Sequence, residues 1–156
     1  MKISRKRVIV ASLLVLALVG IVIVGGCRRS MTTDTRSSSL PDDASKIAFL
    51  RKYLVMPSQV QATEFHIEYH DNDGGLVPGP SEWDMRVVMK VDPAKLPLWT
   101  DGFTPAEGAD LSWGYTLLPS EKRWAIKSKP KVYQRGHAVV AIFETEGIVF
   151  KRVHAE

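Results

Sequence analysis

A basic N-terminus followed by a long uncharged run limits which part of this chain can belong to a folded domain. Met1–Arg7 carries four cations, and Val8–Gly26 then continues for nineteen residues without a charge. A basic region, an apolar region and small residues before a cleavage point are, in this order, the three parts of a secretory signal peptide. We therefore predict that residues 1–26 are a signal peptide and that the domain folds from the remainder of the chain.

The end of the apolar run, Val24-Gly25-Gly26-Cys27, resembles the lipobox of bacterial lipoproteins, in which an aliphatic and two small residues precede a cysteine. The resemblance implies cleavage between Gly26 and Cys27, attachment of a diacylglyceryl group to the Cys27 thiol, and acylation of the new amino terminus. Several acyl chains, at about 0.8 kcal/mol per buried methylene, make a lasting membrane anchor. Arg28 is not the aspartate that the family uses for inner-membrane retention, which favours the outer membrane in a cell that has two.

An uncleaved transmembrane helix is the main alternative for the leader, because nineteen residues suffice to span a bilayer. Three features favour the lipoprotein: the paired glycines, the position of Cys27, and the cations Arg28 and Arg29. A transmembrane helix in this orientation would have few cations on its outer side, where these two arginines would lie. A simply secreted product is the third alternative. All three place the domain outside the cytoplasm.

The net charge of the chain comes from this leader. The whole sequence has 21 basic and 17 acidic residues, and the leader holds four of the basic residues and none of the acids. The rest of the chain is therefore electrically balanced. A balanced domain lacks the basic footprint of a nucleic-acid-binding protein, so we expect no nucleic-acid partner.

The segment after Cys27 is polar. Residues 28–39 have the sequence RRSMTTDTRSSS, in which Met31 is the only sizeable apolar side chain. Such a composition buries too little apolar surface to offset the entropy of ordering the chain. We expect residues 27–40 to be the lipidated cysteine and a flexible tether, and residues 41–156 to be a single domain. One cysteine also excludes a disulfide scaffold.

An amphipathic helix is predicted at the start of this domain. Pro41 and the two acids after it suit the first turn of a helix. Apolar side chains then recur on one broad face, namely Ile47, Phe49, Leu50, Tyr53 and Leu54. Pro57 closes the segment, so we place the helix at Asp42–Val55.

Beyond Ser58 the apolar period changes from 3.6 to 2, which predicts strands. The clearest are Phe65–Tyr69, Trp83–Val91 and a hairpin of His137–Glu144 with Ile148–Val153, which we expect at the centre of the sheet with Gly147 in its turn. Weaker patterns suggest strands at Leu111–Leu118 and Trp124–Tyr133, and Asp92-Pro93 predicts a short helical piece toward Trp99.

One helix followed by four to six strands, without alternation of strands and helices, predicts an α+β fold. The N-terminal amphipathic helix would pack on one face of a mainly antiparallel sheet, because this arrangement buries the apolar faces of both.

His66, Glu68 and His70 are weak candidates for a metal site. On a strand they point to the same face at intervals of about 6.6–6.8 Å, so zinc could bind there if a neighbouring strand supplied another ligand. The alternative is that they form the solvated face of an amphipathic strand, where any polar residue serves.

A basic segment is the first candidate binding surface. Residues 122–135 contain six cations and no acid: Lys122, Arg123, Lys127, Lys129, Lys131 and Arg135. These cations could face anionic lipid or an acidic partner, or they could lie beside the acidic segment 53–85 and neutralise it.

Two tryptophans complete the candidate binding surface. Trp99 and Trp113 flank a loop rich in glycine, proline and acids, which makes them the first candidates for exposed anchors of a binding surface, while burial in the core is the default expectation for tryptophan.

The sequence shows no motif for catalysis, such as a Gly-x-Ser-x-Gly elbow, a phosphate loop or His-Glu-x-x-His. We therefore expect a non-enzymatic domain without a cofactor, which binds a protein partner in the envelope, either an assembly component or a toxin that it neutralises. The alternatives are an envelope hydrolase or metal-dependent protein that uses His66, Glu68 and His70, and a spacer that binds lipid or cell wall through residues 122–135.

Overall fold

A computed structural model describes residues 31–71 and 80–155. Nearly all of the described residues, 32–70 and 82–155, belong to one compact unit, the second of the two into which the chain divides. The predicted signal peptide, including Gly26 and Cys27, lies outside the described residues.

The second unit is built on one seven-stranded sheet with the strand order β1-β2-β3-β7-β6-β5-β4. Every strand pair from β2 to β4 along this order is antiparallel. The strands are β1 (Met31–Arg36), β2 (Val60–Asp71), β3 (Glu82–Val91), β4 (Thr104–Pro105), β5 (Lys131–Arg135), β6 (Ala138–Phe143) and β7 (Ile148–Ala155). A sheet with a few short helices is consistent with an α+β or a mainly β class, and it has more strands than the four to six predicted.

The predicted hairpin is confirmed as β6 and β7, and β7 occupies the middle of the strand order. Gly147 ends the turn with a φ of +63°, and an added Cβ there would collide with the Val91 carbonyl oxygen. Only glycine combines this left-handed backbone with so close an approach.

The predicted N-terminal helix is present but shorter. It is α2 (Asp43–Leu50), capped by the Asp42 carboxylate, which accepts a hydrogen bond of 2.7 Å from the Ser45 amide. After Leu50 the amides of Lys52 and Tyr53 bond to carbonyls three residues back, which tightens the backbone into turns. The helix therefore ends five residues before the predicted Val55, whose side chain is 85% exposed.

The prediction of a flexible tether is wrong for residues 31–39, which form β1 and the 3-10 turn η1 (Ser37–Ser39). Polar contacts with β2 replace the missing apolar burial. The Ser37 hydroxyl donates to Glu64 at 2.5 Å, and the ammonium of Lys46 on α2 holds the same carboxylate at 2.6 Å. Composition alone did not show that polar groups would find these partners.

The segment Leu111–Leu118, predicted as a strand, instead contains the helix α3 (Ser112–Leu117). The segment Trp124–Tyr133 is a strand only from Lys131, because Trp124 ends the short helix η3 (Lys122–Trp124). The short helical piece after Asp92 is confirmed as η2 (Pro93–Trp99), with the Asp92 carboxylate accepting from the Ala94 amide.

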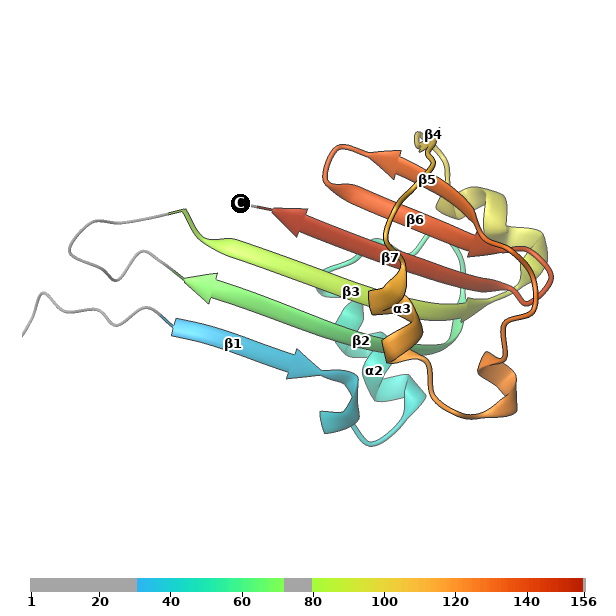
Figure 1. Cartoon of the computed structure of the whole chain (residues 1–156). Coiled ribbons are helices and arrows are strands. Elements are labelled where there is room, and N and C mark those ends of the chain that lie inside the picture. The colour runs from blue at the N-terminus through green and yellow to red at the C-terminus, as the bar shows by residue number, and fades with distance from the viewer. Residues whose placement is uncertain (1–30, 72–79, 156) are drawn as a thin grey trace, which may run out of the picture. The chain divides into compact units, whose positions relative to one another are not determined.

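The two faces of the sheet are covered by different elements. On one face, α2 and η2 bury side chains against Phe65, Val87 and Val149. On the other face, α3 and η3 bury Trp113 and Trp124 against Phe143 and Phe150. Figure 1 shows α3 crossing in front of β3 and β7, with α2 behind the sheet.

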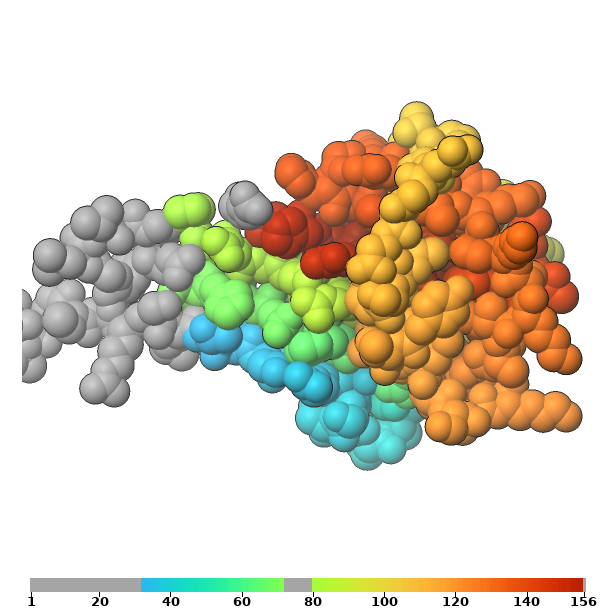
Figure 2. All heavy atoms as spheres, viewed as in Figure 1, coloured from blue at the N-terminus to red at the C-terminus, as the bar shows by residue number. Residues whose placement is uncertain are grey.

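Coverage of the second face is partial. Figure 2 shows the atoms of α3 and the neighbouring orange segments on one part of this face, while atoms of β1, β2 and β3, in blue to green, remain visible beside them. The side chains on this open part alternate with the buried ones along β2 and β3, and they are charged or polar. Within residues 31–71 and 80–155, no helix has the length and apolar character needed to cross a bilayer.

Candidate functional site

The two tryptophans that are candidates for exposed anchors are buried. Trp99 is 2% exposed and donates from its indole nitrogen to the Ser58 hydroxyl at 2.9 Å. Trp113 is 8% exposed, packs against the Phe150 ring and donates to the Asp110 carbonyl. Each indole therefore finds both apolar contacts and a hydrogen-bond acceptor inside the fold, so the default expectation of burial is confirmed and the candidate binding surface does not include these residues.

The six cations of the basic segment are exposed, and two of them are paired with carboxylates. Arg123 pairs with Asp43 of α2 and with Glu121, and Lys131 pairs with Glu144 across the β5–β6 ladder. These contacts hold the pKa values of both cations above their ordinary values, mainly through the side-chain hydrogen bonds to Asp43 and Glu144. Part of the charge of this segment is therefore neutralised by neighbouring carboxylates.

The predicted polar face of β2 meets a partner from the segment predicted to be a tether. Asp34 of β1 places a carboxylate oxygen 2.8 Å from the Nε2 of His66, and a Glu68 oxygen lies 3.7 Å from the same nitrogen. Ligand atoms of Asp34, His66 and Glu68 all lie within 4.8 Å of one another, which is close enough to share a metal ion. We call these three residues the His66 cluster.

His70, the third predicted metal ligand, is not part of the His66 cluster. Its Nδ1 lies 3.0 Å from the Thr32 hydroxyl of β1, with which it is hydrogen-bonded. His66 and His70 thus lie on the same side of β2, as predicted, but each contacts a different residue of β1.

Arginines hold the outer oxygens of the His66 cluster. Arg36 donates to Asp34, and this hydrogen bond is the main reason that the pKa of Asp34 lies below its ordinary value. Arg86 donates to Glu68 at 2.8 Å. Both carboxylates are therefore oriented by a guanidinium on one side while facing His66 on the other.

Asp84 continues this polar network across β3 and β7. Its carboxylate accepts from Arg86 and, at 2.9 and 3.0 Å, from Arg152. Burial alone would raise the pKa of Asp84, but the hydrogen bonds from Arg152 and Arg86 outweigh it and hold the pKa below the ordinary 3.8. Since the side chain is 12% exposed, this is the best shielded carboxylate of the network.

Replacing Asp84 with asparagine should destabilise the fold at neutral pH by about 1–2 kcal/mol, between the values for exposed and buried ion pairs. A carboxyl with a lowered pKa stabilises the fold above its unfolded pKa, and this contribution is lost as the pH falls through the folded value. The difference in the free energy of unfolding between wild type and variant should therefore shrink below about pH 4. Urea unfolding at pH 7 and pH 3 measures this difference. An equal gap at both pH values would contradict this assignment.

An apolar groove lies on the other face of the sheet, beside α2. Its volume is about 490 Å³, and it is lined by Thr33, Thr35, Phe49, Tyr53, Ile67, Tyr69 and Trp83, which we call the aromatic groove. Phe49 forms its floor, stacked on Phe65 with ring centroids 5.4 Å apart. Tyr53 is 53% exposed and Tyr69 40% exposed, so aromatic surface remains open to solvent.

The sequence identified some of the apolar residues of the aromatic groove, but it did not predict that they would line a groove. Tyr53 belongs to the predicted apolar helix face and Tyr69 to the predicted apolar strand face, and both were expected to be buried. Because α2 ends at Leu50, it does not extend over this end of β2, and both rings stay partly exposed. Thr33 and Thr35 could not be predicted as lining residues of the groove, since they lie in the predicted tether.

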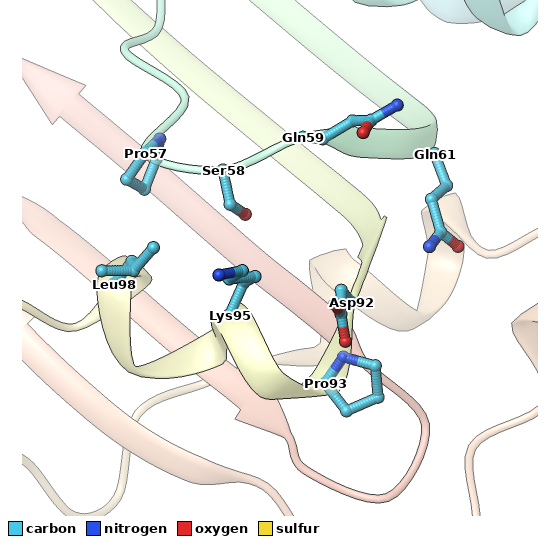
Figure 3. Close-up of a pocket in the computed structure, with 8 residues that line it drawn as sticks. All are labelled: Pro57, Ser58, Gln59, Gln61, Asp92, Pro93, Lys95 and Leu98. Carbon is cyan, nitrogen blue, oxygen red and sulfur yellow. The ribbon is translucent and has the colours of Figure 1, made fainter.

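A second pocket, of about 440 Å³, lies between η2 and the segment that leads into β2. Figure 3 shows Lys95 and Leu98 of η2 facing Pro57 and Ser58 across it. Ser58 already accepts from Trp99, and the Asp92 carboxylate at the rim caps η2. Two of its polar groups therefore stabilise the fold, which makes this pocket the weaker candidate site.

Lys151 is the one lysine of β7, and it points to the same face of the sheet as the buried Val149. Burial holds the pKa of its ammonium below the ordinary value, and the nitrogen lies 5.8 Å from the centre of the Phe103 ring. The arrangement fits a lysine whose stem packs on the sheet while its charge reaches toward an aromatic face.

Comparison with known proteins gives no further guide to the site. Neither the models of protein families, nor the curated proteins, nor the solved structures contain a match to this chain.

Proposed function

We propose that this chain is a lipid-anchored protein of the bacterial envelope, whose domain acts by binding a protein partner at the aromatic groove. The leader and its lipobox-like end support the anchor at Cys27. They support a location outside the cytoplasm and favour the outer membrane in a cell that has two. The domain works by contact rather than by catalysis, as an assembly component or by neutralising a toxin.

The observation that carries the binding role is the exposed aromatic surface of the groove. Phe49, Tyr53 and Tyr69 offer rings to solvent beside the apolar wall formed by Ile67 and Trp83. Tyrosine, tryptophan and phenylalanine are enriched in the buried centres of protein interfaces, where large rigid rings bury much area at little entropic cost. A contiguous exposed apolar patch is also costly in a soluble domain unless a partner covers it.

A photoreactive amino acid at Tyr69 tests this role in the native cell. We expect a crosslinked adduct with one protein, and loss of that adduct when Tyr53 is changed to serine. Tyr115 provides a matched control, because it is also a tyrosine, is 47% exposed and lies on α3 over the opposite face of the sheet. Equal capture from positions 69 and 115, or no capture from position 69, would refute the groove as the binding surface.

A metal-dependent role at the His66 cluster is the second candidate function. The favourable observation is that Asp34, His66 and Glu68 can direct one ligand atom each to a common point. A nitrogen and two carboxylate oxygens are ligands that zinc accepts, and three protein ligands leave a position open for water or substrate. Arg36 and Arg86 oppose it, because their positive charges lie next to the two carboxylates.

Two histidine variants separate this candidate from a purely structural network. If zinc binds the cluster, titration with zinc alone should give one equivalent in wild type and in His70→Ala, and none in His66→Ala. His70 is a matched control because it lies on the same side of β2 but contacts Thr32. Equal zinc binding by both variants, or none by wild type, would remove the metal-dependent function.

A further inference from the structure

The strand at the rim of the aromatic groove is also the edge of the sheet. β1 stands at the end of the strand order, and in the described part of the chain no strand pairs with its outer side (Figure 1). The backbone N–H and C=O groups on that side of an edge strand can pair with an added strand. β1 contains no proline, and its two charged side chains, Asp34 and Arg36, pair with each other.

The side chains of β1 alternate between the two faces of the sheet. Thr33 and Thr35 line the aromatic groove, whereas Thr32 and Asp34 contact His70 and His66 on the opposite face. An extended segment added beside β1 would alternate in the same way. Every second side chain of that segment would therefore lie next to Thr33 or Thr35, at the mouth of the groove.

The short connection to Cys27 limits how far β1 can be from the anchor. The backbone advances by five residues from Cys27 to Thr32, which is at most about 18 Å when fully extended. Thr32 bonds to His70, and His70 pairs with Glu82, so these residues mark one end of the sheet. With Cys27 acylated, this end of β1 must stay close to the bilayer surface.

From these three observations we infer that the partner adds an extended juxtamembrane segment to the free edge of β1, with apolar side chains at alternate positions entering the aromatic groove. The partner is itself anchored in the membrane that holds Cys27. This inference rests on the proposed function and names its partner class. Main-chain pairing supplies the geometry, and the groove selects for the apolar side chains.

Strand addition and simple docking in the groove predict different crosslinks. An added strand lies beside the side chains on both faces of β1, because cross-strand neighbours are about 4.5–5.5 Å apart on either face. A partner that only fills the groove would lie near Thr33 and Thr35, which line it, but not near Thr32 and Arg36. The opposite face of β1 is thus the diagnostic one.

The experiment places a photoreactive amino acid, one position at a time, at Thr32, Thr33, Thr35 and Arg36 of the full-length chain in its native cells, with Tyr115 as the control position. We expect all four β1 positions to capture one protein, at a segment next to its own membrane span or lipid anchor, and position 115 not to capture it.

Each other outcome has a distinct meaning. Capture from positions 33 and 35 alone would overturn strand addition and leave the groove as a binding site. Capture of a second copy of this chain, or of a protein with no membrane attachment, would overturn the partner class. Absence of capture from all β1 positions and from Tyr69 would refute the proposed function as well.

Discussion

Replacing Gly114 with valine destabilises the domain by about 1–3 kcal/mol, the usual cost of overpacking a core. Gly114 lies in α3, where an added Cβ would collide with the ring of Phe150. Phe150 is fully buried and contacts Phe143 and Trp113, so its ring cannot move without disturbing its neighbours. The close approach of α3 to β7 thus depends on the missing side chain.

Thr116→Val provides the matched control for this prediction, since it creates the same residue in the same helix at an exposed position. We expect it to lower the free energy of unfolding by only about 0.5–1 kcal/mol, because valine removes the hydrogen bond that the Thr116 hydroxyl donates to the Trp113 carbonyl. Urea denaturation of both variants, followed by tryptophan fluorescence, makes the comparison. A Gly114→Val protein as stable as wild type would show that α3 is not packed on Phe150.

Replacing Cys27 with serine should abolish lipidation completely. The serine hydroxyl cannot take the place of the thiol that would receive the diacylglyceryl group, and the resemblance to the lipobox implies that cleavage follows that step. Labelling cells with a radioactive fatty acid should therefore give a labelled wild-type band and an unlabelled, larger Cys27→Ser precursor. Cys27 is the only cysteine, so no other thiol can account for a label on wild type.

Persistent labelling or normal processing of the Cys27→Ser protein would contradict the lipobox assignment. Serine at Ser30, three residues later, offers a control position: Ser30→Ala should be labelled and processed like wild type. If both variants lost the label, the loss would reflect expression or export rather than the thiol at position 27.

Strands with one apolar and one polar face could be predicted from the sequence. β2 and β3 show period-2 alternation because each buries one face under α2, and the β6–β7 hairpin shows continuous apolar runs because both of its faces are covered. The N-cap Asp42 and the Asp92-Pro93 start of η2 could also be predicted, since their side chains act within a few residues of themselves.

Elements that depend on distant partners were missed. Leu111, Trp113, Tyr115 and Leu117 alternate like a strand, yet Trp113 and Leu117 are also four residues apart on one face of a helix. The helix is favoured over the strand because Gly114, which has no side chain, lets this segment pack closely on Phe150. In the same way, β1 is held by polar contacts to residues more than 25 positions away, such as Asp34 with His66.

In the candidate sites, too, features set by local sequence could be predicted, and features that depend on distant residues could not. His66 and Glu68 could be predicted as neighbours because strand geometry fixes their spacing, whereas Asp34 could not, because it comes from a segment expected to be a tether. The aromatic groove depends on where α2 ends relative to Tyr69, which no local pattern determines. For the same reason the sequence left both exposure and burial open for Trp99 and Trp113, since burial is a property of the assembled fold.

The anchor at Cys27 is the central claim, because it fixes the compartment and the height of β1 above the membrane. Intact-mass measurement of the protein extracted from its native cells tests it most directly. We predict a chain that begins at residue 27 and carries the added mass of a diacylglyceryl group and an acylated amino terminus. A chain that retains residues 1–26 with an unmodified thiol at position 27 would contradict the account.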